Sequence, residues 1–220
     1  MDERLTQAAS LFPVVRIGAD IGANHGMLAC HLLKAGKAQK MWITDLSSDA
    51  LEQARQNVKA SGLSSRAEFA VGDGFSAMTE PADAAAILGM GGATFATILE
   101  SAPQELLPKY LVVSCHTEQE TARRAICERG FEIVQERVCF SGGRYYVLHQ
   151  AVRSKDAVIP DERTLFIGPC LGREHSQVYR DYLTRRLAAY SPSRSAEGMK
   201  RCQWLREEAD RAAADSKSSL

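Results

Sequence analysis

The sequence predicts an α/β fold in which a mainly parallel sheet ends in an antiparallel edge hairpin and is followed by a small helical domain. Three observations support this prediction. Short apolar stretches alternate with helical patterns, several apolar stretches end in an acidic residue or in glycines, and after residue 153 helical patterns predominate. We therefore expect an α/β domain over residues 1–153 and a C-terminal helical domain over residues 154–220.

The expected elements follow one another in a regular order. A short helix over residues 2–11 ends at Pro13. The expected parallel strands span residues 15–20, 41–44, 67–71, 84–88 and 110–114. Helices are expected over residues 27–35, between Ser47 and Gly62, and over residues 93–100 and 118–129. Residues 132–139 and 145–151 predict an antiparallel pair joined across the glycines of 141–144.

The C-terminal region predicts a hairpin of two helices with a basic outer face. A polar linker with Pro160 leads to helical patterns over about 176–190 and 196–213, which are broken at residues 191–193. Between Arg173 and Arg206 there are eight basic and three acidic residues, which favours an anionic partner. Taken alone, the same arginines are better explained as an ordinary solvated helix face.

The sequence carries no signal for a membrane or for export. No window approaches about 18 uninterrupted apolar residues, and the first residues lack the pattern of a secretory signal, so we expect a cytoplasmic protein. The six cysteines show no C-x-x-C pair and no zinc spacing, which predicts free thiols and no metal site. Cys115 and His116 are neighbours on a strand and point to opposite faces, so a catalytic dyad is not expected.

The loop Asp20-Ile21-Gly22-Ala23-Asn24-His25-Gly26 organises the predicted site. It follows a buried strand and opens into a helix, which is how a doubly wound sheet forms a ligand crevice at its carboxyl edge. Asn24 stands where the G-x-G-x-x-G pattern has the glycine that admits a pyrophosphate. A dinucleotide therefore fits poorly, and a ligand with one ribose, one purine and an uncharged or zwitterionic tail fits better.

Acidic residues at three strand ends match the parts of S-adenosylmethionine. Asp45 is placed to accept hydrogen bonds from ribose hydroxyls, Asp73 from the adenine amine, and Asp20 from an ammonium group, directly or through water. A sulfonium is also well tolerated near carboxylates. Helix capping is the weaker explanation for Asp45 and Asp73 together. The candidate cofactor-binding residues are Asp20, Gly22, Asp45, Leu46, Asp73 and Gly74.

The glycine-rich loop after the fourth strand lies where the substrate of such a fold meets the donor methyl group. Three glycines in Gly89-Met90-Gly91-Gly92 leave the backbone bare for a flat base, and a simple turn rarely needs three. His25 faces the same cleft, where hydrogen bonding to a substrate and pinning of the loop are equally good explanations. The candidate catalytic residues are Asn24, His25, Gly89, Met90, Gly91 and Gly92.

These motifs occur in a characteristic order, which also includes Gly72-Asp73-Gly74 and Ser141-Gly142-Gly143-Arg144-Tyr145-Tyr146. The series resembles the bacterial tRNA (adenine-22-N1)-methyltransferase family, whose members carry D-I-G-[ST]-D-H, G-D-G, G-M-G-G and D-G-[KR]-[FY]-Y. The resemblance covers nearly the whole chain. It implies a Rossmann-like class I methyltransferase sheet followed by a helical coiled-coil domain. Two departures mark a divergent member: Asn24 replaces an acidic residue, and Ser114-Cys115-His116 replace an expected Gln-Pro.

The resemblance implies methylation of adenine N1 in tRNA, with S-adenosylmethionine as the donor. The ring nitrogen supplies its own lone pair, so catalysis would rest on positioning and electrostatics. The tRNA backbone would lie along the basic helices, which include Arg180, Arg185 and Arg186. Two alternatives stay open: a methyltransferase for another RNA, a protein or a small molecule, and a catalytically silent nucleotide-binding or scaffolding protein whose helices bind a protein partner.

Overall fold

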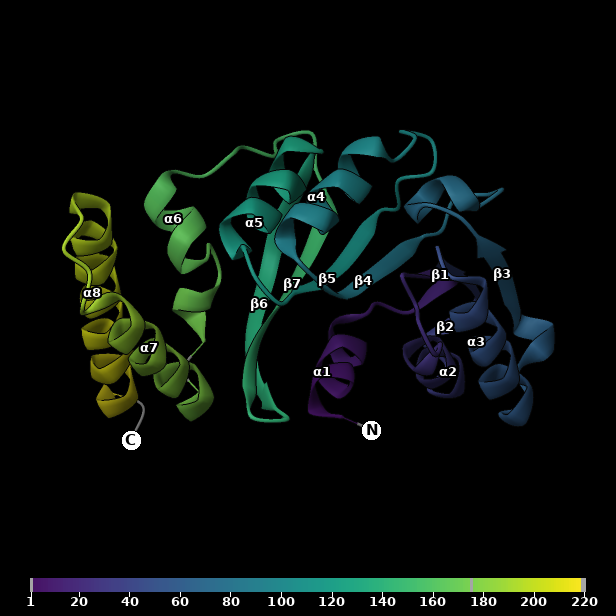
Figure 1. The fold of residues 1–220 in the computed structure, drawn as a ribbon, viewed down its shortest axis with the longest axis horizontal. Coiled ribbons are helices and arrows are strands. Elements are labelled where there is room, and N and C mark those ends of the chain that lie inside the picture. Colours follow the sequence, from purple (N-terminus) through teal and green to yellow (C-terminus); the bar gives the residue numbers. More distant parts are fainter. Residues whose placement is uncertain (1, 175, 219–220) are drawn as a thin grey trace.

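The computed structural model describes residues 2–174 and 176–218, which contain a seven-stranded sheet and a pair of long C-terminal helices at one end (Figure 1). The strands are β1 (Val15–Ile21), β2 (Ala38–Asp45), β3 (Ala67–Val71), β4 (Ala84–Met90), β5 (Tyr110–Cys115), β6 (Phe131–Ser141) and β7 (Arg144–Arg153). The helices are α1 (Glu3–Leu11), α2 (Met27–Lys34), α3 (Ser48–Ala60), α4 (Gly92–Ser101), α5 (Gln119–Glu128), α6 (Glu162–Ile167), α7 (Gln177–Tyr190) and α8 (Ala196–Ser218).

The strand order is β3-β2-β1-β4-β5-β7-β6. Strands β1 to β5 pair in parallel, and β7 pairs antiparallel with both β5 and β6, which confirms the predicted sheet with its edge hairpin. The chain runs from β1 outward to β2 and β3 and then returns to β4 on the other side of β1. The carboxyl ends of β1 and β4 therefore border the topological switch point, where open α/β sheets bind ligands.

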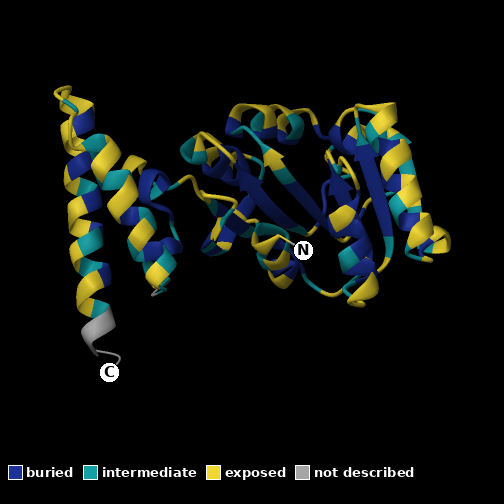
Figure 2. Cartoon of the chain, turned by 60° about the horizontal axis from the view of Figure 1, so that its bottom comes forward, coloured by how far each residue is buried: buried dark blue, intermediate teal, exposed yellow. Residues whose placement is uncertain are grey.

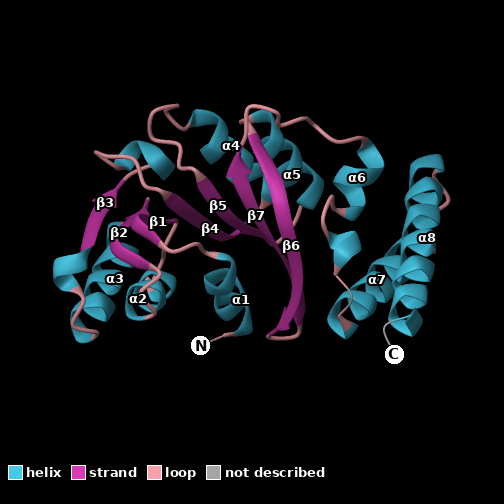
Figure 3. Cartoon of the chain, turned by 180° about the vertical axis from the view of Figure 1, so that it is seen from behind, coloured by secondary structure: helices cyan, strands magenta, loops and turns pink. Residues whose placement is uncertain are grey.

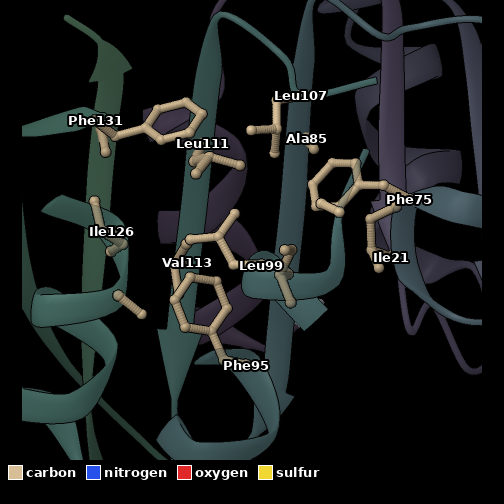
Figure 4. Packing of buried hydrophobic residues seen from close by; sticks show 14 of the residues in the cluster. Ile21, Phe75, Ala85, Phe95, Leu99, Leu107, Leu111, Val113, Ile126 and Phe131 are labelled. Atoms are coloured by element: carbon tan, nitrogen blue, oxygen red, sulfur yellow. The ribbon is translucent and has the colours of Figure 1, made fainter. Parts of the chain in front are cut away.

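Helices cover both faces of the sheet (Figure 3). Adjacent strand residues divide between two cores, because successive side chains of a strand point to opposite faces. Ala86 and Val112 pack with α1, α2 and α3, whereas Ile87 and Val113 pack with α4 and α5. Figure 4 shows the second core, in which Phe95 of α4 lies against the strands. Burial on both faces explains why β4 and β5 are apolar almost throughout (Figure 2).

The C-terminal helices pack against the β6–β7 hairpin. Their core joins Val138 and Val147 of the hairpin to Phe166, Leu183 and Leu205. After residue 153 the structure differs from the expectation at two places. The helix α6 forms where a polar linker and the apolar run after it were expected, and α8 extends to Ser218 rather than ending near residue 213. Asp161 accounts for the start of α6, because its carboxylate caps the helix by accepting the Thr164 N–H at 2.8 Å.

A buried ion pair joins the sheet to this helical region. Arg123 Nε donates to Glu136 Oε1 at 2.8 Å, and both side chains are almost fully buried. Arg123 also donates to the carbonyl oxygens of Leu165 and Phe166, and Glu136 accepts the N–H groups of two residues just beyond α6, Cys170 and Leu171. Burial alone would raise the pKa of Glu136, but Arg123 and His149 lower it to about 2. The pair therefore stays charged and fixes residues 165–171 against β6.

Candidate functional site

The loop between β1 and α2 is shaped by backbone conformations that few residues adopt. Gly22, Asn24 and Gly26 all have positive φ angles, of 67°, 50° and 64°. Asparagine is one of the few residues other than glycine that readily adopt a positive φ angle. The conformation of the loop therefore favours asparagine at position 24, in addition to any chemical role of its side chain. The N–H groups of Gly22 and Ala23 donate to the Thr44 carbonyl at 2.9 and 3.0 Å, so the end of β2 holds the loop in place.

Asp20 is a buried carboxyl group at the end of β1, 4% exposed. Its Oδ2 accepts the Ala29 N–H from the first turn of α2 at 3.2 Å. Burial is the main cause that raises its pKa to about 7; the Ala29 hydrogen bond opposes this shift and the negative charge of Asp45 adds to it. A carboxyl group poised near neutrality is suited to receive a cationic group of a ligand.

Asp45 ties together the first two loops of the carboxyl edge. Its Oδ2 accepts the Asn24 N–H at 2.9 Å and its Oδ1 accepts the Ser47 N–H at 2.9 Å. Ser47 in turn caps α3 by accepting the Ala50 N–H. Each carboxylate oxygen keeps a further lone pair, so Asp45 can hold the loop and still accept a ligand hydroxyl. Leu46, which follows it, is 72% exposed and offers an apolar surface at this edge.

A cavity of about 240 Å³ lies where the β1–α2 loop meets the end of β4. It is lined by Arg4, Leu5, Asp20, Gly22, Ala23, Asn24, His25, Met27, Leu28, Leu88 and Gly89. The structure thus brings together five of the residues predicted for the site, from two segments far apart in the sequence: Asp20, Gly22, Asn24, His25 and Gly89. The side chain of His25 is exposed, and its carbonyl is held by the Asn57 amide at 2.9 Å.

Three aromatic or basic side chains beside Gly89 were not predicted for the site. The guanidinium of Arg4, on α1, lies 5.3 Å from the centre of the Tyr146 ring, and His116 meets the same ring edge-on at 5.6 Å. A Cβ atom at Gly89, where φ is 83°, would lie 3.3 Å from Arg4 Nη1 and 3.7 Å from His116 Nε2. Tyr146 belongs to the last motif of the series, but no local pattern singles out Arg4.

Gly91 and Gly92 contact another loop of the protein rather than the cavity expected to receive a substrate base. A Cβ atom at Gly91 would lie 3.3 Å from Thr117 Oγ1, and one at Gly92 would collide with the Glu118 carbonyl oxygen. The Gly92 N–H donates to the Thr117 carbonyl at 3.2 Å. These two glycines therefore allow the start of α4 to approach the loop before α5, and they do not line the cavity. Met90 reaches under the first loop, since its Cε lies 3.1 Å from the position of a Cβ on Gly22.

The end of β3 lies at the same edge of the sheet but outside the cavity. The Asp73 side chain is exposed, and within residues 2–174 and 176–218 it makes no hydrogen bond, so it does not cap a helix. Gly74 is buried, has a φ of 53°, and leaves room for Ile98. Of the two, Asp73 has the free acceptor that an adenine amine requires.

As the sequence predicts, Cys115 and His116 do not form a catalytic dyad. Cys115 is buried, burial raises the pKa of its thiol to about 12, and His116 points to the exposed side. Among the residues that the structure describes, no three histidine, cysteine or carboxylate side chains are grouped as a metal would require. None of the helices in the described part of the chain is long and apolar enough to cross a membrane.

A buried carboxyl group and glycines at the switch point of a doubly wound sheet define the site of a nucleotide-binding type of α/β protein. The chain belongs to the methyltransferase domain family, whose model, described as "Methyltransferase domain", matches residues 1–148.

Relatives confirm the more specific resemblance of the motifs. The tRNA (adenine(22)-N(1))-methyltransferase of Bacillus subtilis (strain 168) is 28% identical over 222 residues, which cover 96% of this chain and 93% of the relative. Among solved structures, a putative tRNA (m1A22) methyltransferase of Streptococcus pneumoniae superposes with a TM-score of 0.86 at 22% identity, covering 95% of this chain and 99% of its own. TrmK of M. capricolum, in complex with S-adenosyl-homocysteine, gives 0.83 at 21% identity, covering 96% and 99%.

Proposed function

We propose that this protein transfers a methyl group from S-adenosylmethionine to N1 of an adenine in tRNA. The observation that carries the proposal is the cavity in which Asp20 and Gly22 of the first loop meet Gly89 at the end of β4. The name of the B. subtilis relative gives the reaction and the position, adenine 22. A tRNA substrate also agrees with a cytoplasmic location.

The residues present fit the cofactor. The cavity is slightly smaller than most small-molecule pockets, which suits the methionine tail, and the adenosine would extend along the open edge toward Asp45 and Asp73. Asp20 would hold the ammonium group, while Gly22 leaves the backbone open to the tail. Leu46 and Gly74 would flank the adenosine. S-adenosylmethionine supplies an electrophilic methyl group when it is bound.

The residues of the chain have positioning roles in this reaction. Adenine N1 attacks with its own lone pair, so no general base is needed, and the protein has to hold the ring in line and tolerate the positive charge of the product. Gly89, Arg4 and Tyr146 border the side of the cavity where the base would enter, and the amide of Asn24 offers a dipole there. Residues 1–153 would perform the transfer, and residues 154–220 would hold the tRNA through basic side chains that include Arg180, Arg185 and Arg186.

Transfer of labelled methyl groups to unmodified tRNA transcripts tests the proposal. We expect incorporation into transcripts with adenine at position 22, a primer-extension stop at that nucleotide, and no incorporation when it is replaced by guanine. Asp45→Ala is expected to weaken S-adenosylmethionine binding in a calorimetric titration. Incorporation at another nucleotide would overturn the assigned position, and the absence of cofactor binding would overturn the proposal as a whole.

A further inference from the structure

A groove of about 410 Å³ lies between the turn of the β6–β7 hairpin and α7. Six residues line it: Arg144, Tyr145, Tyr182, Arg185, Arg186 and Ala189. The hairpin turn stands between α1 on one side and α7 on the other (Figures 1 and 3). The groove is therefore separate from the cavity beside Asp20, and it lies on the opposite side of the hairpin from α1.

Two lining residues of the groove, Tyr145 and Tyr182, belong to a row of aromatic rings that continues to Phe140 outside it. The Tyr145 ring lies 4.8 Å from that of Phe140 and 5.8 Å from that of Tyr182, measured between ring centres, with tilts of 54° and 50°. Phe140 is 48% exposed, and both tyrosines are only partly buried. Partly exposed rings beside basic side chains are the usual platform on which proteins stack the unpaired bases of single-stranded RNA.

The lining residues of the groove carry positive charge only. Three of the six are arginines, and none is a carboxylate. Arg144 and Arg185 are exposed, and neither side chain makes a hydrogen bond or ion pair to any residue that the structure describes. Arg186 is held in place, with its guanidinium 4.2 Å from the centre of the Phe166 ring and donating to the Phe166 carbonyl at 3.1 Å.

Four other basic residues of the helical region are already paired. Arg163 binds Glu207, Lys200 binds Glu162, and Arg201 binds both Glu120 and Glu197; Arg211 binds Glu208 and Asp215. These ion pairs neutralise part of the basic face that the sequence suggests, whereas the arginines that line the groove face no carboxylate among its lining residues.

Strand β7 connects this groove to the catalytic side. Tyr145 and Tyr146 are consecutive on the strand, so their side chains point to opposite faces. Tyr146 contacts Arg4 and His116 beside the cavity, whereas Tyr145 contacts Tyr182 of α7. An RNA strand whose target base enters the cavity beside Tyr146 would need to pass only around the hairpin turn to reach Tyr145.

We propose that this groove binds an unstacked nucleotide of the RNA substrate, next to the nucleotide that is methylated. The base stacks on the rings of Tyr145 and Tyr182, and Arg144 and Arg185 contact the phosphates on either side of it. This inference rests on the proposed function, because it assigns a second contact to the same RNA.

Paired substitutions separate stacking and charge from folding. Tyr145→Leu keeps an apolar side chain in the helical core but removes the ring, and Tyr145→Phe keeps the ring. We expect Tyr145→Leu to weaken binding of unmodified tRNA by roughly 5- to 150-fold and Tyr145→Phe to stay near the wild type. Arg144→Ala and Arg185→Ala are each expected to lower the slope of log Kd against log salt by about 0.7 to 0.9. Arg206→Ala, an exposed arginine of α8 outside the groove, is the matched control and should change affinity less than Arg185→Ala.

The affinity for S-adenosylmethionine, measured by calorimetry, reports whether each variant keeps its folded catalytic side. Weaker tRNA binding with unchanged cofactor affinity supports the groove. Unchanged tRNA binding by Tyr145→Leu, or equal losses for Arg185→Ala and Arg206→Ala, would overturn the proposed RNA contact at the groove. Unchanged tRNA binding is also the result expected if the groove binds a protein instead of RNA. Failure of the proposed function has a different signature, because the wild type itself would then methylate no tRNA. Photocrosslinking of 4-thiouridine-labelled tRNA to Tyr145 or Tyr182 would locate the contact directly.

Discussion

Replacing Asp20 by asparagine should stabilise the cofactor-free protein at neutral and higher pH. The folded state raises the pKa of this carboxyl group from 3.8 to about 7, mainly through burial, so ionising it in the folded protein is unfavourable. The shift corresponds to about 4 kcal/mol of stability that is present at pH values below 4 and lost as the pH rises to about 7. Asparagine keeps the shape and an oxygen that accepts the Ala29 N–H, and it never ionises.

Urea unfolding of the wild type and Asp20→Asn at pH 5, 6, 7 and 8 measures this effect. The difference in the free energy of unfolding between the two proteins should grow in favour of the variant by about 2.5 kcal/mol from pH 5 to pH 8. Every other ionisable group is common to both proteins, so the difference isolates Asp20. A difference that is the same at all four pH values would refute the reasoning, because it would mean that Asp20 titrates alike in the folded and unfolded states.

Three further predictions concern the cofactor, the buried ion pair and the glycine-rich loop. S-adenosylmethionine binding by the wild type should strengthen up to about tenfold per pH unit below pH 7 and level off above it, as Asp20 ionises, and calorimetry should find no such dependence in Asp20→Asn. Glu136→Gln leaves the Arg123 guanidinium buried without a counter-charge and should lower the free energy of unfolding, measured with urea, by about 3–5 kcal/mol. The control is Glu207→Gln at the exposed pair with Arg163, which should lower it by less than about 1 kcal/mol. Gly92→Ala introduces a Cβ that collides with the Glu118 carbonyl oxygen and should cost about 1–3 kcal/mol, which thermal unfolding would register as a Tm lower by about 2–12 °C.

Much of the fold could be predicted because the strands are buried on both faces and bounded by turn residues. The third strand has the expected limits, and β1 extends only one residue beyond its range. The helix α6 was missed because its six residues are too few to show a helical period, and its apolar run fits a strand equally well. The sequence could not reveal that residues 165–171 pack on the sheet, since that depends on a contact between Arg123 and Glu136.

The site could be predicted where the fold alone determines proximity. Strand ends of a doubly wound sheet meet at one edge, so Asp20, Asn24 and Gly89 were expected together, and they line one cavity. Arg4 could not be anticipated, because the packing of α1 brings it there. Gly91 and Gly92 show a limit of sequence patterns: a bare backbone admits a ligand or another loop, and here it admits the loop before α5.

The buried ion pair between Arg123 and Glu136 makes deletion of the helical region a poor test of what that region does. The carbonyl groups that Arg123 binds and the backbone N–H groups that Glu136 binds all belong to residues 165–171. A protein truncated after residue 153 would lose these partners and would expose the face of β6 and β7 that α6, α7 and α8 now cover. Lost activity in such a fragment would report damage to the catalytic part as readily as lost RNA contacts. Point substitutions at the groove leave this ion pair intact, so they can separate lost RNA contacts from damage to the catalytic part.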